Sequence, residues 1–258
     1  MTKSDSVARD LQKGRGKLFG VGIGPGDPEL VTLKTLRLIR SADVLAYPQP
    51  DNGPSLARAI VAEHIPDKGP NGPLEEYPIV IPMVTARFPA QDVYDTAAEE
   101  LAEKLREGKT VVVLCEGDPF FYGSFMYLYG RMQGDFDVEV VPGVSSIMAS
   151  AAITGAPLAA RNDVLTVIPG PVGEETMRAR LSSAEAAVII KVGRHFGKIR
   201  SVLSEMGLME CSRYIERATM DNQRILPLSE VDEGAAPYFS MILVHKRGDA
   251  WSLDAAKG

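Results

Sequence analysis

Short apolar runs that end at glycine-containing loops dominate the first half of the chain. Residues 17–23, 110–115 and 137–141 form such runs, and each has the length of a buried strand. Between them, residues 29–40 and 92–107 repeat their apolar side chains at the spacing of an amphipathic helix. Strands that alternate with helices in this way predict an α/β fold.

The pattern changes around residues 157–161, where a second series of elements begins. Strands are expected at 164–168, 186–192, 212–217 and 238–245, and helices at 174–181 and 196–205. We therefore predict two α/β lobes: a flexible arm over 1–16, a first domain over 17–157 and a second over 158–258. Residues 48–90 are rich in proline and are expected to form a loop-rich insertion with one short helix near 55–63.

Composition and charge narrow the classes of protein that remain. The 258 residues are 45% hydrophobic and 24% charged, which is ordinary for a globular protein, and the net charge of -6 disfavours a nucleic-acid partner. The first residues lack the apolar core of a secretory signal, and the longest apolar runs fall far short of the ~20 residues that cross a bilayer. Two cysteines and three scattered histidines provide no disulfide framework and no metal-ligand spacing. We expect a cytoplasmic protein without a metal or a membrane partner.

Three loops that follow predicted strands are the candidates for chemistry, at residues 24–27, 116–119 and 142–146. The first loop fits neither a dinucleotide fingerprint nor a P-loop, because Pro25 removes an amide donor and the glycines lie two apart. Alone, it is better explained as a connector without a ligand. Together, at the carboxyl ends of strands, the loops offer amides, a carboxylate and hydroxyls. That set suits a zwitterionic nucleoside with an amino-acid tail.

The same loops also resemble a known family. The segments GVGIGPGDPELVTLKTLRLIRSADVLAYP, EGDPFFYGSFMYLY and VVPGVSSIMASAA are similar, in order and spacing, to the three N-terminal motifs of the tetrapyrrole (class III) methyltransferases. The resemblance extends to about residue 245. The residues within the motifs are most similar to those of the carbon-20 methyltransferases that act on precorrin-2. It implies two α/β lobes, a homodimer, and S-adenosyl-L-methionine bound in the cleft between the lobes and released as S-adenosyl-L-homocysteine.

The resemblance also implies which residues contact the methyl donor. In the first lobe these are Pro25, Glu116, Gly117, Asp118, Ser145 and Ser146. In the second lobe they are Val192, Ala218, Pro237, Tyr238 and Phe239. Glu116 departs from the family pattern, because many relatives have glycine there. Asp118 and the two serines have an alternative role as helix caps, since these residue types are common at the start of a helix.

The implied reaction is methylation of precorrin-2 at ring carbon 20, giving precorrin-3A on the way to cobalamin. Alternatives within the family are the cobalt-containing substrate cobalt-factor II, another corrin carbon, and a protein side chain as in diphthine synthesis. From another class, a nucleotide-binding module without a methyl acceptor also fits the three loops. The motifs alone do not separate these possibilities.

Methyl transfer from a sulfonium needs alignment and exclusion of water more than a strong base. Tyr47 is a candidate to line the substrate trough and Tyr122 to lie near the transferred methyl group, and both are candidates for a general base. The alternative for each is a place in the core. The carboxylates of a tetrapyrrole need basic partners. Candidates are Arg161, Lys191, Arg194 and Arg217, each of which is as well explained as a solvated surface charge.

Overall fold

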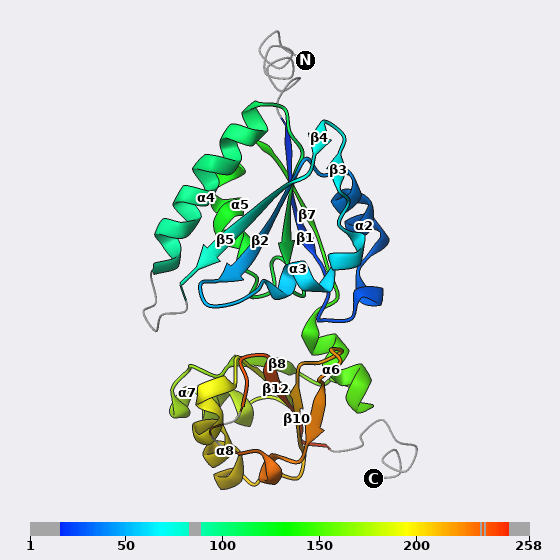
Figure 1. Ribbon diagram of the computed structural model, residues 1–258. Helices are drawn as coiled ribbons and strands as arrows, with labels where there is room; N and C mark the ends of the chain where they lie inside the picture. The colour runs from blue at the N-terminus through cyan, green and yellow to red at the C-terminus, as the bar shows by residue number, and fades with distance from the viewer. Residues whose placement is uncertain (1–15, 83–88, 233, 235, 248–258) are drawn as a thin grey trace. The chain divides into compact units, whose positions relative to one another are not determined.

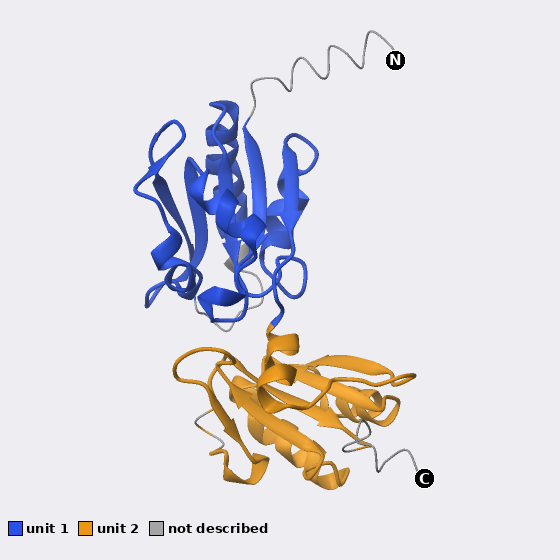
Figure 2. Ribbon diagram, turned by 90° about the vertical axis from the view of Figure 1, so that its right-hand side faces the viewer, with its two compact units in different colours: residues 1–145 blue, residues 146–258 orange. Residues whose placement is uncertain are grey.

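The chain forms two compact units, residues 1–145 and 146–258 (Figure 2). The computed structural model describes residues 16–82, 89–232, 234 and 236–247 (Figure 1). Most of the predicted arm therefore lies outside the described residues. Among the helices that are described, none has both the length and the apolar character needed to cross a membrane.

Unit 1 is built on a five-stranded sheet with the order β5-β2-β6-β1-β7. Its strands are β1 (Lys17–Gly22), β2 (Val44–Pro50), β5 (Glu75–Ile81), β6 (Val111–Cys115) and β7 (Asp137–Val141). Every neighbouring pair is parallel, so all five carboxyl ends lie at one edge. A small hairpin of β3 (Lys68–Gly69) and β4 (Gly72–Pro73) lies apart from this sheet. The predicted strands at 17–23, 110–115 and 137–141 are confirmed.

Helices cover both faces of this sheet, as Figure 1 shows. They are η1 (Pro28–Leu30), α2 (Leu33–Arg40), α3 (Leu56–Ile60), η2 (Ala62–His64), α4 (Pro89–Arg106) and α5 (Phe125–Met132). Alternate residues of β6 point to opposite layers. Val111 and Val113 join one core cluster with α4 and α5, whereas Val112 and Leu114 join another with α2 and α3. A central parallel strand is therefore apolar throughout, because neither of its faces meets water.

The segment predicted to be a loop-rich insertion contains β5. This strand was not predicted, because the many prolines of the segment indicated loops. Pro78 lies within β5 and pairs with Tyr47 of β2. Because β5 is an edge strand, one side of it has no ladder partner, and a residue without an N–H is tolerated there. The short helix expected near 55–63 is present as α3 and η2.

Unit 2 has a mixed sheet with the order β11-β10-β12-β9-β8. Its strands are β8 (Leu165–Pro169), β9 (Ala186–Ile190), β10 (Ser212–Glu216), β11 (Arg224–Leu226) and β12 (Ser240–His245). β12 runs antiparallel to β9 and to β10, and β8 is parallel to β9. The carboxyl ends of β8, β9 and β10 therefore share one edge with the start of β12.

Unit 2 also has helices on both faces of its sheet. They are α6 (Ser146–Thr154), α7 (Glu174–Ser182), η3 (Gly193–His195), α8 (Phe196–Glu205) and η4 (Leu228–Glu230). α7 and α8 supply one core cluster, and Ile147 of α6 packs with Val188 and Ile215 on the other face. This packing places α6 in the second compact unit, whereas the change of pattern put it in the first domain. The boundary after residue 157 stays a prediction about folding domains.

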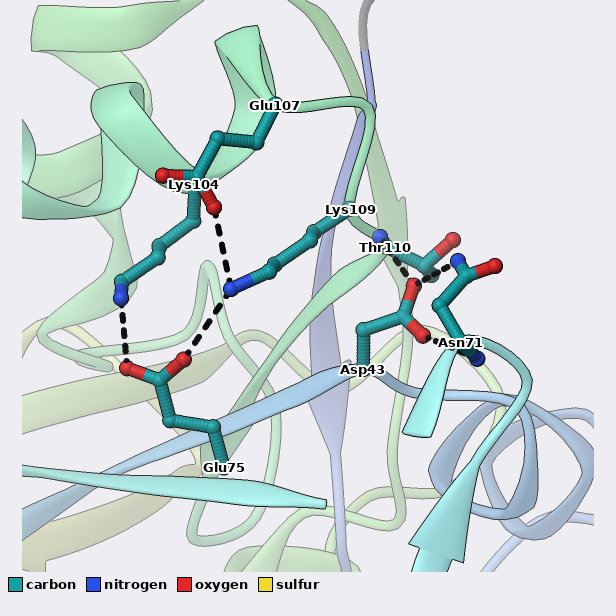
Figure 3. A network of polar contacts seen from close by, with 7 residues as sticks. All are labelled: Asp43, Asn71, Glu75, Lys104, Glu107, Lys109 and Thr110. Atoms are coloured by element: carbon teal, nitrogen blue, oxygen red, sulfur yellow. Dashed lines mark hydrogen bonds and ion pairs between the residues drawn. The ribbon is translucent and has the colours of Figure 1, made fainter. Parts of the chain in front are cut away.

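Polar side chains tie together the amino edge of the sheet in unit 1 (Figure 3). The buried carboxylate of Asp43 accepts hydrogen bonds from Asn71 N at 3.0 Å, Asn71 Nδ2 at 3.1 Å and Thr110 N at 2.9 Å. Beside it, Glu75 pairs with Lys104 at 2.8 Å and with Lys109 at 3.4 Å. These contacts join the starts of β2, β5 and β6, so they set the register of the strands at this edge.

Candidate functional site

The three glycine-containing loops meet at the carboxyl edge of the sheet in unit 1. Gly117 N donates to Gly24 O at 2.7 Å, which joins the loops after β1 and β6. A Cβ added to Gly22 would lie 2.5 Å from Gly143 Cα, and one added to Gly143 would lie 2.1 Å from Gly117 O. No side chain fits at that spacing, so the backbones of the three loops pack directly against one another. Gly24 and Gly117 also need glycine for their backbone, since their φ angles are +81° and +65°.

Asp118 holds two of these loops together. One carboxylate oxygen accepts from Phe120 N at 2.9 Å and from Phe121 N at 3.1 Å, and the other accepts from Gly143 N at 3.1 Å. These bonds close a turn ahead of α5, whose N-cap position is Ser124, so the predicted alternative of a helix cap is not what Asp118 does. The same side chain also links the β6 loop to the β7 loop. Contact of Asp118 with a ligand stays a prediction.

The first loop is anchored to the helix that follows it. Asp27 accepts from Glu29 N at 2.8 Å and so caps η1. Thr32 caps α2, and the buried hydroxyl of Thr35 donates to Gly22 O at 3.1 Å. Pro25 is buried between these anchors. Hydrogen bonds thus anchor the loop on both sides of Pro25. Its contact with the methyl donor stays a prediction.

Glu116 turns its carboxyl group toward α3. Burial raises the pKa of this carboxyl, while hydrogen bonds from its own backbone amide and from that of Ala57 act in the opposite direction. The side chain thereby connects the β6 loop to the start of α3, a contact that glycine could not make. Its predicted contact with the methyl donor stays a prediction.

The two candidate tyrosines have different environments. Tyr47 is only 6% exposed, and its hydroxyl donates to Glu76 Oε2 at 2.9 Å. Glu76 is also held by Arg58, and burial raises the pKa of Tyr47. These contacts support the core alternative for Tyr47.

Tyr122, in contrast, is 44% exposed in the β6 loop and has a φ of +57°. An aromatic residue in the left-handed region is strained, and such strain occurs most often at functional sites. Its ring meets Phe121 edge-on at 5.1 Å between centroids. The geometry therefore favours Tyr122 over Tyr47 as a residue that faces a ligand.

In unit 2, the candidate contacts for the methyl donor converge on one edge of the sheet. Val192 follows β9, Ala218 follows β10, and residues 237–239 precede β12. Arg217 N donates to Phe239 O at 2.7 Å, and a Cβ added to Gly193 would lie 3.7 Å from Tyr238 Cα. Segments far apart in the sequence are thus neighbours in space. Ser145 and Ser146 stand at the start of α6, which is a position for caps as well as for ligand contacts.

The structure separates the four basic candidates into two groups. Lys191, Arg194 and Arg217 lie at the edge where β9 and β10 end. Arg161 lies ahead of β8, in a loop that Asp163 ties to His245 and Arg247 at the end of β12. That is the opposite edge of the sheet, so Arg161 does not join the other three. Lys191, Arg161 and Arg217 all have positive φ angles, of 56°, 53° and 47°.

Sequence reasoning missed a group of buried polar contacts at the edge of unit 2 where β9 and β10 end. Glu216 is 2% exposed and lies among Tyr214, Arg217 and Arg224, while Lys198 donates to Gly170 O at 2.7 Å. The available signal was the position of Glu216 on the same face of a predicted strand as Tyr214, since a carboxylate that is buried there needs partners. Over residues 16–82, 89–232, 234 and 236–247, no cluster of three or more His, Cys, Asp or Glu side chains is arranged to hold a metal ion.

Curated relatives share most of this chain. A precorrin-2 C(20)-methyltransferase of Sinorhizobium sp is 42% identical over 90% of this chain and 96% of its own length. A cobalt-precorrin-2 C(20)-methyltransferase of Salmonella typhimurium is 32% identical over 90% of this chain and 97% of its own. The cobalamin biosynthesis protein CobIJ of Mycobacterium bovis is 44% identical over 89% of this chain, which spans 46% of that longer protein.

A solved structure has the same fold. Uroporphyrin-III C-methyl transferase from Thermus thermophilus, complexed with S-adenyl homocysteine, superposes with a TM-score of 0.65 and 26% identity, over 89% of this chain and 97% of that one. The family model described as tetrapyrrole (corrin/porphyrin) methylases matches residues 17–232. This match covers the sheet of unit 1, every strand of the sheet of unit 2 except β12, and all three glycine-containing loops. The chain therefore belongs to the tetrapyrrole methylases.

Proposed function

We propose that this chain transfers the methyl group of S-adenosyl-L-methionine to carbon 20 of precorrin-2, in the biosynthesis of cobalamin. The products are precorrin-3A and S-adenosyl-L-homocysteine. The observation that carries this proposal is the 42% identity to a relative of that name, because the match spans 96% of the relative. The relative that is named for the cobalt-containing substrate is less similar, at 32% identity.

The residues at both strand edges fit a methyl donor of this kind. Its flat base and its amino-acid tail need apolar surface beside backbone donors and acceptors. In unit 2, Tyr238 and Phe239 are 61% and 43% exposed next to the ends of β9 and β10. In unit 1, the loops at Gly117 and Gly143 bring their backbones into contact at the carboxyl edge of the sheet, which is where ligands of open parallel sheets bind. We assign the donor to Pro25, Glu116, Gly117, Asp118, Ser145 and Ser146, and to Val192, Ala218, Pro237, Tyr238 and Phe239.

The chemistry asks the protein for alignment rather than for a strong base. The donor supplies a methyl carbon bonded to a sulfonium, which is an activated leaving group. The ring carbon attacks in line with the carbon–sulfur bond, and the proton that this ring carbon carried is lost afterwards. Rigid loops at a strand edge hold the two reactants in that line and keep water away. Tyr122, which is exposed and strained, is the side chain of unit 1 that we place beside the reacting atoms.

The carboxylates of the substrate need cations, and Lys191, Arg194 and Arg217 are grouped at the edge where the methyl donor is proposed. Replacement of each by alanine is expected to raise the KM for precorrin-2. Arg161→Ala provides the comparison, because Arg161 lies at the opposite edge of the same sheet and its loss should leave that KM unchanged. An unchanged KM in all three edge variants would remove this assignment.

The test of the reaction has two stages. Calorimetric titration with S-adenosyl-L-homocysteine should show binding, and incubation with labelled S-adenosyl-L-methionine and precorrin-2 should add one methyl group to the tetrapyrrole, which NMR places at carbon 20. Parallel incubation with cobalt-factor II distinguishes the two candidate substrates. Faster turnover of cobalt-factor II than of precorrin-2 would favour the cobalt-containing substrate. Absence of binding would overturn the proposal.

The proposed enzyme is a cytoplasmic homodimer. The dimer rests on the family resemblance, and the cytoplasm rests on two cysteines that are both free, Cys115 being buried and Cys211 half-buried. Light scattering on the purified protein should give twice the mass of the chain, and fractionation of the source cells should recover it with cytoplasmic enzymes. A mass of one chain, or recovery with the membrane fraction, would contradict this part.

A further inference from the structure

A buried carboxylate lies directly behind the edge of unit 2 where the methyl donor is proposed. Glu216 is the last residue of β10 and is 2% exposed. The hydroxyl of Tyr214 donates to Glu216 Oε1 at 3.0 Å, and the guanidinium groups of Arg217 and Arg224 lie 3.4 and 3.6 Å from Oε2. We call Tyr214, Glu216 and Ser240 the β10–β12 hub, because Ser240 faces Glu216 across the ladder.

The hub is connected to both segments that are proposed to contact the donor. Ser240 Oγ donates to Pro237 O at 2.6 Å, so it holds the turn that carries Tyr238 and Phe239. Arg217 N donates to Phe239 O at 2.7 Å, which joins the end of β10 to that turn. A displacement of Glu216 would therefore move residues 217–218 and 237–239 together.

The backbone at this point is strained and needs such support. Arg217 and Thr219 have φ angles of +47° and +68°, in a region that side chains other than glycine adopt at a cost. Thr219 N donates to Gln223 Oε1 at 2.7 Å, and Met220 N donates to Arg217 O at 3.0 Å. Strained residues persist where the surroundings over-determine them, and they cluster at sites that bind ligands. Here the strain flanks Ala218.

Burial of a carboxylate lowers stability, so the presence of glutamate at position 216 needs a reason other than stability. An apolar side chain at position 216 would avoid the desolvation of a charge, and buried ion pairs often add nothing to stability. Tyr214 is itself fully buried and packs edge-on against Phe196 at 5.4 Å between ring centroids, so apolar packing is available at this place. What an apolar residue could not do is hold Arg217 and Tyr214 in fixed positions.

We infer that Glu216, with Tyr214 and Ser240, is a positioning group that sets the backbone of residues 217–218 and 237–239 for the methyl donor. None of the three touches the reacting atoms. The inference rests on the proposed function, because the proposed function supplies the methyl donor that these residues position. It predicts a defect in binding of the donor without a defect in the chemical step.

The decisive variants are Glu216→Gln, which keeps the shape and removes the charge, and Tyr214→Phe, which removes one hydroxyl. The Kd for S-adenosyl-L-homocysteine and the KM for S-adenosyl-L-methionine should rise about tenfold in Glu216→Gln, as expected for loss of hydrogen bonds to a charged group. They should rise by a smaller factor in Tyr214→Phe. The kcat at saturating donor should stay within about twofold of wild type, because the transition state makes no contact with the hub.

Ser212→Ala is the matched control, at the other end of the same strand. Ser212 is buried, and its hydroxyl donates to Leu208 O at 2.7 Å. Its loss should lower Tm while leaving the Kd for S-adenosyl-L-homocysteine unchanged. A purely structural role for Glu216 would give that same result, a lower Tm with unchanged Kd and KM, and would overturn the inference.

The outcomes also separate this inference from the proposed function. If wild-type protein fails to bind S-adenosyl-L-homocysteine, the proposed function fails and the inference falls with it. If wild type binds and both hub variants bind equally well, the inference alone is wrong. If Glu216→Gln does not fold, Tyr214→Phe decides, since it removes only one oxygen from the interior.

Discussion

The two edges of the sheet in unit 1 are held together by different means. At the amino edge, side chains make the contacts: Asp43 accepts three hydrogen bonds, and Glu75 lies between two lysines (Figure 3). At the carboxyl edge, backbones contact one another directly at Gly22, Gly117 and Gly143, and the carboxylate of Asp118 adds one link between two of the loops. The amino edge is thus held by polar side chains, whereas the carboxyl edge is held mainly by direct approach of backbones, which leaves no room for side chains at Gly22 and Gly143.

This difference follows from the direction of the strands. All neighbouring pairs are parallel, so every loop that leaves a strand in the forward direction emerges at the same edge. Ligands of open parallel sheets bind outside that edge. Substitutions at the amino edge should therefore change stability alone, and substitutions at the carboxyl edge should change binding as well.

The largest effect is expected from Gly143→Ala. The added Cβ would lie 2.1 Å from Gly117 O, and neither backbone can move without disturbing the hydrogen bond from Gly143 N to Asp118. We expect a loss of about 3 kcal/mol or more in the free energy of unfolding, as for severe overpacking. Binding of S-adenosyl-L-homocysteine should weaken at least about tenfold, which corresponds to ~1.4 kcal/mol.

Gly130→Ala is the control for this substitution. Gly130 lies in α5, is exposed, and a Cβ added to it meets nothing within 4 Å. Alanine there should stabilise the helix by about 0.5–1 kcal/mol and leave binding unchanged. Urea denaturation and calorimetry measure both quantities. Normal binding in Gly143→Ala would show that the glycine contact is not part of a ligand site.

An intermediate effect is expected from Asp43→Ala at the amino edge. Asn71 and the amide of Thr110 would lose their buried acceptor, at a cost of about 2–3 kcal/mol in the free energy of unfolding. The Kd for S-adenosyl-L-homocysteine should stay within about twofold of wild type under conditions where the variant is folded, because the contact lies at the far edge. A large change in that Kd would break the distinction between the two edges.

The smallest effect is expected from Glu75→Gln. Hydrogen bonds and charge from Lys104, and then from Lys109, lower the pKa of Glu75 below its ordinary value of 4.5. A lowered pKa in the folded state means that the stabilisation is present above pH 4.5 and is lost as the pH falls through the lowered value. Because the pair is partly exposed, the difference from wild type at pH 7 should be at most about 1 kcal/mol.

Thermal unfolding of the Glu75→Gln and wild-type proteins between pH 7 and pH 3 checks the sign. The two unfolding temperatures should approach one another at acid pH. A difference that grows on acidification would contradict the assigned pKa direction, and addition of salt at pH 7 should reduce the difference because exposed pairs are screened.

The secondary structure could be predicted from the sequence wherever apolar periodicity was strong. The apolar runs ending at Cys115 and Val141 are strands, and residues 89–106 form the long helix that was expected near 92–107. β5 was missed because Pro78 interrupts its pattern, and only its place at the edge of the sheet makes that proline tolerable. A rule about single residues cannot contain that information, since an edge is a property of the assembled sheet.

The candidate site could be predicted in part. The loops at Gly24, Gly117 and Gly143 do meet, as their places after parallel strands suggested. The direction of the Glu116 side chain and the separation of Arg161 from Arg217 could not be predicted. The first depends on where α3 begins, and the second on β12 running against its neighbours.

The sequence by itself determined the family and most of the strands and helices, because motif spacing and apolar periodicity are local, but β5 and β11 were not among the expected strands. The tertiary structure decided which side chains share an edge and which are consumed by internal contacts. Tyr47, Asp118 and Glu216 show this best, since each resembles a free polar residue in the sequence. Their roles follow from burial and from partners that are distant in the sequence. Tyr47 bonds to Glu76, 29 residues away, and Asp118 bonds to Gly143, 25 residues away. Glu216 faces Ser240 across a ladder. The pairing of distant segments is a collective result of packing, and no single stretch of chain encodes it.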